Sequence, residues 1–110
     1  LNTFEIDTTT GAATLRANAP AIGTPSGPVG IVVGRRFLYV VNEEDGNIHG
    51  FAIEGGSGAV TSTPGSPYTL AGISDPFNLA MDAKETTVAV NDCDDGDYGF
   101  ALIDKLTGAL

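Results

Sequence analysis

Two segments of the chain have nearly the same pattern of apolar and polar residues. They are "RRFLYVVN" at residues 35–42 and "ETTVAVN" at residues 85–91. Each is a short run rich in β-branched and aromatic residues that ends on an Asn, with turn-forming residues beyond it. Runs of this length and composition predict β-strands rather than helices. The two segments therefore predict the same strand at two places in one chain.

The repeat extends beyond these two strands. The phrase "FEIDTTTGAAT" at residues 4–14 matches "FAIEGGSGAVT" at residues 51–61, and the chain end "ALIDKLTGAL" matches both. Gly11, Gly58 and Gly108 hold the same place in the three phrases, so the period is 47 and then 50 residues. A period of this length indicates a repeat architecture.

A second phrase helps to assign the strands within the period. Residues 28–42 match residues 76–91, and both phrases keep the same order inside the repeat. Four strands fit one period: "GIVV" or "NLAMD", then "FLYVV" or "TVAV", then "IHGFAI" or "YGFALI", and a fourth near "VTSTPGSPYTL". Stretches such as "EEDGN" and "EGGSG" predict the turns between them. The expected fold is all-β, built from the four-stranded antiparallel blades of a β-propeller.

The repeat also predicts the boundaries of the units. We expect residues 1–27 to hold the third and fourth strands of one blade, residues 28–70 a complete blade, and residues 71–110 the first three strands of the next. About two blades form only an incomplete ring, so we expect a fragment of a longer protein, a chain that assembles with other copies, or an open stack. Residues 1–14 could then supply a fourth strand to a neighbouring copy.

The phrases "GRRFLYVVN", "IHGFAIEGGSGAVT" and "GSPYTLAGISDPFNLAMD" resemble the lactonase-type seven-bladed β-propellers, which include YVTN-repeat surface proteins and 6-phosphogluconolactonase-like enzymes. The resemblance covers essentially the whole chain, but its motifs build blades and do not mark an active site. The short length, the acidic composition and the lack of a catalytic constellation favour a non-catalytic scaffold or binding module that could assemble through its matched terminal strands, whereas the resemblance alone supports an enzyme. The alternative is part of a sugar-lactone hydrolase, so whether the chain belongs to an enzyme stays open.

Charge narrows the range of partners. Fourteen acidic residues face five basic ones, for a net charge of −9, which disfavours nucleic acid and anionic membrane surfaces. No apolar run approaches the roughly 18 residues of a membrane span, so we expect no membrane insertion. The expected partners are other copies of the chain or the remaining blades of a parent chain. The Lys-poor composition, rich in Thr, Ser and Gly, favours an extracytoplasmic location, either secreted or at the cell surface.

Three basic residues are candidates for catalysis or for binding a substrate. His49 is the only histidine and is the candidate for a catalytic base. Its repeat counterparts are Asn2 and Gly99, so the blade does not need a histidine there, and a strand residue without a chemical role is the favoured interpretation. Arg35 and Arg36 could hold an anionic sugar acid, although a turn between two strands also accounts for them.

The acidic run "NDCDDGD" at residues 91–97 is the candidate for a metal site. Clustered carboxylates can bind Ca²⁺, but the spacing is not that of an EF-hand, and a solvated hairpin turn explains the run as well. We therefore expect no cofactor, with Ca²⁺ as the alternative. The single cysteine excludes an internal disulfide and is expected to be inert among carboxylates. The candidate ligands are Asp92, Asp94, Asp95 and Asp97.

Overall fold

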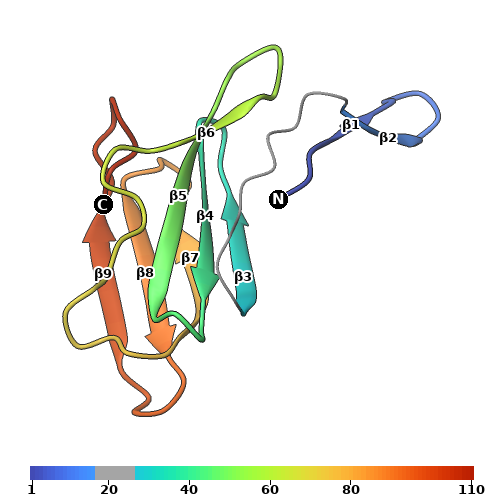
Figure 1. Ribbon diagram of the computed structural model, residues 1–110. Coiled ribbons are helices and arrows are strands. Elements are labelled where there is room, and N and C mark those ends of the chain that lie inside the picture. Colours follow the sequence, from blue (N-terminus) through green and yellow to red (C-terminus); the bar gives the residue numbers. More distant parts are fainter. Residues whose placement is uncertain (17–26) are drawn as a thin grey trace.

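The computed structural model describes residues 1–16 and 27–110, and within them the fold is all-β, as predicted (Figure 1). The part of the expected 1–27 unit that falls on residues 17–26 lies outside the described residues. No helix occurs in the described ranges, and so none that could span a membrane. The strands are β1 (Phe4–Ile6), β2 (Ala13–Leu15), β3 (Pro28–Val33), β4 (Phe37–Asn42), β5 (Asn47–Ile53), β6 (Val60–Ser62), β7 (Pro76–Met81), β8 (Thr87–Asp92) and β9 (Tyr98–Leu102).

The strands form three antiparallel sheets in which neighbours in the chain are neighbours in space. The first sheet holds β1 and β2, the second holds β3, β4, β5 and β6, and the third holds β7, β8 and β9. Each strand follows its predecessor through a turn, so every sheet is a simple meander. The edge strands of the two larger sheets are β3, β6, β7 and β9, each with a neighbour on one side only among the described residues.

One turn recurs three times, at the glycines that mark the repeat in the sequence. Gly11, Gly58 and Gly108 have φ angles of 74°, 65° and 75°, a left-handed conformation that glycine adopts without a steric cost. In each turn the glycine amide donates to the carbonyl oxygen four residues earlier, at 2.7, 2.9 and 2.8 Å. The repeated phrase therefore encodes one repeated backbone conformation.

The strand register refines the comparison between the second and third sheets. Pro28 pairs with Asn42 and Pro76 pairs with Asp92, with an irregularity directly after each proline. The turn between β7 and β8 is two residues longer than the turn between β3 and β4. Equivalent residues of the two sheets are therefore 48 residues apart before this turn and 50 residues apart after it. The counterpart of Asn42 is therefore Asp92, whereas the sequence match had aligned it with Asn91.

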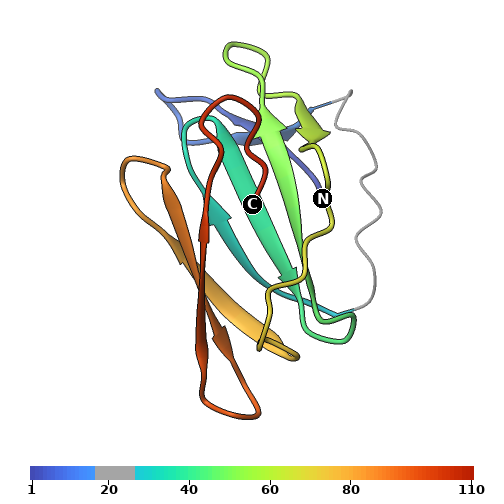
Figure 2. The same cartoon turned by 90° about the vertical axis from the view of Figure 1, so that its left-hand side faces the viewer.

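The second and third sheets pack face to face (Figure 2). Alternate side chains of a strand point to opposite faces, so every second residue of β4 contributes to this interface. Leu38 and Val40 of β4 belong to a smaller cluster on the other face, so both faces of the strand are buried. The main core consists of Phe37, Tyr39, Val41, Ile48, Ile73, Leu79, Val88, Val90 and Ile103.

Candidate functional site at the acidic loop end

Three loops meet at one end of the second and third sheets: residues 43–46, residues 70–75 and residues 93–97 (Figure 1). A backbone hydrogen bond joins the last two, since the Cys93 amide donates to the Asp75 carbonyl oxygen at 3.0 Å. These loops and the adjoining strand end carry most of the negative charge of the chain. The acidic residues gathered there are Glu43, Glu44, Asp45, Asp75, Asp92, Asp94, Asp95 and Asp97.

Asp92 is buried at the end of β8, and both of its carboxylate oxygens accept backbone hydrogen bonds. Oδ2 accepts from the amides of Ser74 and Asp75 at 2.7 and 3.1 Å, and Oδ1 accepts from the amide of Asp94 at 3.0 Å. These amides, Ser74 first, lower the pKa of Asp92 to about 2. The carboxylate therefore ties the 70–75 loop to the third sheet.

The other three candidate ligands, Asp94, Asp95 and Asp97, are exposed in the turn between β8 and β9. A hydrogen bond with Asp94, helped by burial and by the charges of Asp94 and Asp92, raises the pKa of Asp75. Within residues 1–16 and 27–110, no three carboxylate, imidazole or thiol groups are placed so that they could hold a metal ion. The Ca²⁺ site therefore stays a prediction from the sequence, because the described residues contain no arranged set of metal ligands.

His49 lies on β5 opposite Val40, on the face of the second sheet that points away from the third sheet. It is 9% exposed and stacks on Phe51 with ring centroids 6.2 Å apart. Burial lowers the pKa of His49, and the charge of Asp45 opposes this only partly, so the imidazole is neutral at pH 7. Its Nε2 atom is buried and has no hydrogen-bond partner in the part of the chain that the structure describes. The structure does not bring His49 together with the four candidate aspartates, which belong to the third sheet.

Arg35 and Arg36 lie at the opposite end of the sheets, in the turn between β3 and β4. Arg36 Nε pairs with Glu85 Oε2 at 3.3 Å, and Arg36 Nη1 donates to the Lys105 carbonyl oxygen at 2.6 Å. The Glu85 carboxylate also accepts hydrogen bonds from the backbone amides of Arg35 and Arg36. The two arginines therefore help to hold the second sheet to the third.

Sequence reasoning did not single out Glu85, although it is the buried carboxylate that joins the two sheets at this end. Its partners lie 49 and 50 residues earlier in the chain, so no local pattern reveals the contact. A hollow of about 430 Å³ beside it is lined by Arg35, Arg36, Ala83, Lys84 and Glu85. No protein-family model, curated protein or solved structure matches the chain.

Proposed function

We propose that this chain is a segment of a lactonase-like β-propeller and acts as a non-catalytic scaffold or binding module. The observation that carries the proposal is that one unit recurs and stacks on itself. The second and third sheets share their strand order, the irregularity after the first proline and the glycine turn, and they bury an apolar interface between them. Repeated sheets of this kind are stable because each covers the apolar face of the next.

The proposed partners are other copies of the chain or further blades of the same kind. Among the described residues strand β9 has one neighbour, β8, whereas its counterpart β5 pairs with β6 as well. The β1–β2 hairpin has the register of the β5–β6 hairpin, since Phe4 pairs with Leu15 as Phe51 pairs with Ser62. Strand β2 therefore has the right phase to supply a fourth strand beside β9 of another copy. We further propose an extracytoplasmic location, which the Lys-poor and acidic composition favours.

The placement of the candidate catalytic groups supports a role without catalysis. Lactone hydrolysis needs a base for water and a group that polarises the carbonyl, both within reach of one substrate atom. His49 and Asp92 belong to different sheets, with His49 on the face of the second sheet that points away from Asp92. Asp92 is engaged by backbone amides, and Arg36 by Glu85 and Lys105.

The test is hydrolysis of a sugar δ-lactone, followed as acid release by the chain and by the His49→Gln variant. We expect both to give the uncatalysed rate. Leu106→Asp is a suitable control for the effect of a surface change, because Leu106 is almost fully exposed in a turn. Hydrolysis well above the uncatalysed rate that is lost in His49→Gln and kept in Leu106→Asp would overturn the non-catalytic assignment.

A further inference from the structure

The face of the third sheet that points away from the second carries a row of exposed apolar side chains. Tyr98, Phe100 and Leu102 alternate along β9 and are 73, 72 and 78% exposed. Their cross-strand partners on β8 are Asn91, Ala89 and Thr87, so this face has small and uncharged side chains beside the apolar row. Such a surface on a chain of net charge −9 marks a contact area. We call it the leading face.

The repeat identifies what covers the leading face. Fifty residues earlier, Ile48, Gly50 and Ala52 hold the same places on β5, because they pair with β4 as Tyr98, Phe100 and Leu102 pair with β8. Ile48 belongs to the core between the second and third sheets, and it is buried beside Tyr68, with which its backbone pairs. In the second sheet this face is covered by β7 over β3 and β4 and by the segment around Tyr68 over β5, whereas in the third sheet the corresponding face is exposed. What fits on the open copy is another sheet of the same kind.

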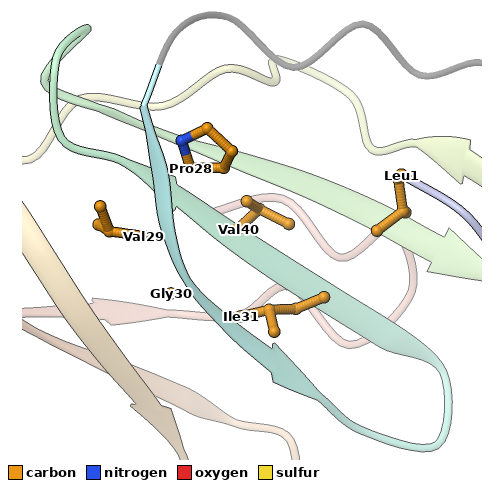
Figure 3. A pocket seen from close by; sticks show the side chains of 6 residues that line it. All are labelled: Leu1, Pro28, Val29, Gly30, Ile31 and Val40. Atoms are coloured by element: carbon orange, nitrogen blue, oxygen red, sulfur yellow. The ribbon is translucent and has the colours of Figure 1, made fainter.

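A second face, on the other side of the molecule, is exposed along the edge strand β3. The middle of this face is already buried, since Leu38, Val40 and Phe51 form a cluster against which Leu1 packs. Ile31 and Val33 point away from the third sheet and are 52 and 61% exposed. Their counterparts 48 residues later, Leu79 and Met81, pack against the second sheet. We call this surface the trailing face. A hollow of about 290 Å³ lies on it (Figure 3), lined by Leu1, Pro28, Val29, Gly30, Ile31 and Val40.

We propose that a second copy of this chain docks head to tail, with the leading face of one copy on the trailing face of the next. The leading face corresponds to the side of the second sheet that meets the third sheet. The trailing face corresponds to the side of the third sheet that meets the second sheet. Because the two faces differ, the contact is heterologous and can repeat into a ring or a filament. The inference rests on the proposed role as a stacking repeat segment and names the surfaces through which it stacks.

Charge predicts how this association depends on salt. The side chains named on both faces carry no charge, so the charged groups nearest to the contact are those of the loop ends. Docking with the geometry of the internal interface places the acidic loop ends of the two copies side by side, as it does for residues 43–46 and 93–97 within one chain. Repulsion between these ends opposes association and is screened as the Debye length falls from about 30 Å to about 3 Å between 0.01 and 1 M salt. Association should therefore strengthen with sodium chloride.

The experiment measures the mass of the full chain by light scattering during size exclusion, over a wide range of concentration and at low and high salt. The wild type should exceed the single-chain mass of 11.2 kDa, increasingly so with concentration and salt. Phe100→Asp places a charge on the leading face, and Ile31→Asp places one on the trailing face. The measured mass of each variant alone should therefore stay at 11.2 kDa. The control Leu106→Asp adds the same charge outside both faces and should behave as the wild type.

An equimolar mixture of Phe100→Asp and Ile31→Asp gives the sharpest result. The first variant keeps its trailing face and the second keeps its leading face, so the mixture should form a one-to-one dimer and nothing larger. A wild type that stays monomeric under all conditions would overturn the proposal, as would a mixture that stays monomeric or variants that assemble like the wild type. None of these outcomes bears on the lactone assay, so the two proposals fail separately.

Discussion

Glu85 offers the strongest prediction about what holds the second and third sheets together. It is 5% exposed and lies in the turn between β7 and β8. Its carboxylate accepts from the amides of Arg35 and Arg36 and pairs with the Arg36 guanidinium at 3.3 Å. Replacing Glu85 by Ala removes the acceptor for all of these donors at once and should lower the free energy of unfolding.

The contacts set the size of the loss. The Arg36 side chain is half exposed, so the ion pair itself contributes at most about 1 kcal/mol. A hydrogen bond to a charged group contributes about 1.5–3 kcal/mol, and the two part-buried amides fall at the low end because water can replace the carboxylate. The expected loss for Glu85→Ala is therefore about 3 kcal/mol. This is a large fraction of the roughly 5–15 kcal/mol that stabilises a typical domain.

Two further variants separate the causes. Glu85→Gln keeps an oxygen acceptor and removes the charge, so it should lose about 1 kcal/mol. Glu85→Gly loses the same acceptor as Glu85→Ala but relieves the left-handed backbone, since Glu85 has a φ of 54°. That conformation costs a residue with a Cβ atom roughly 1–2 kcal/mol, so Glu85→Gly should be about 1 kcal/mol more stable than Glu85→Ala.

The assay is urea unfolding at pH 7, followed by far-ultraviolet circular dichroism, with Glu44→Ala as the control. Glu44 is an exposed acidic residue at the other end of the sheets, and its replacement should change the unfolding free energy by less than about 0.5 kcal/mol. If Glu85→Ala proved as stable as Glu44→Ala, the carboxylate would not join the sheets and the reasoning would be refuted.

Three further predictions concern the same interface and the acidic end. Gly108→Ala should lose clearly more stability in urea than Gly11→Ala. The two glycines share the left-handed φ, but a Cβ atom at residue 108 overlaps the Phe37 ring, whereas one at residue 11 meets no atom. Equal losses would contradict this reasoning. Tyr39→Phe should lose about 1–2 kcal/mol in the same assay, since its buried hydroxyl donates to the Gly108 carbonyl oxygen at 2.9 Å; an unchanged midpoint would refute it. The depressed pKa of Asp92 predicts a stabilising contribution that is complete above its ordinary value of 3.8 and is lost as the pH falls toward 2. An acid titration of Asp92→Asn should lack this part of the loss, and a profile identical to the wild type would contradict the assignment.

The all-β fold and the recurring turn could be predicted from sequence because both depend on local patterns. Short apolar runs predict strands, and Gly108 recurs where the backbone needs a left-handed residue. The equivalence of Asn42 and Asp92 could not be predicted, since it depends on a turn that is two residues longer in the second unit. The propeller assignment itself stays a prediction, carried by the repeat and by the resemblance of its phrases.

The candidate site was harder to predict because the chemistry of a carboxylate depends on its tertiary partners. Asp92 and Asp94 look alike in the sequence, but one is buried and accepts backbone amides while the other is exposed. Glu85 has no motif around it, since its partners are 49 and 50 residues away. The sequence offers His49 as the candidate base. In the structure His49 lies on the face of the second sheet that points away from the third sheet, so it is apart from the aspartates there.

The central claim is that the second and third sheets are two copies of one unit stacked face to face, and nuclear Overhauser effects test it directly. We predict effects from the Phe37 ring to Gly108 and from Gly30 to Phe77, because these pairs join the two sheets. Leu38, which points to the opposite face of β4, should show none to the third sheet. Contradiction would be the reverse pattern, with Leu38 in contact with the third sheet, or the absence of any effect between the two sheets.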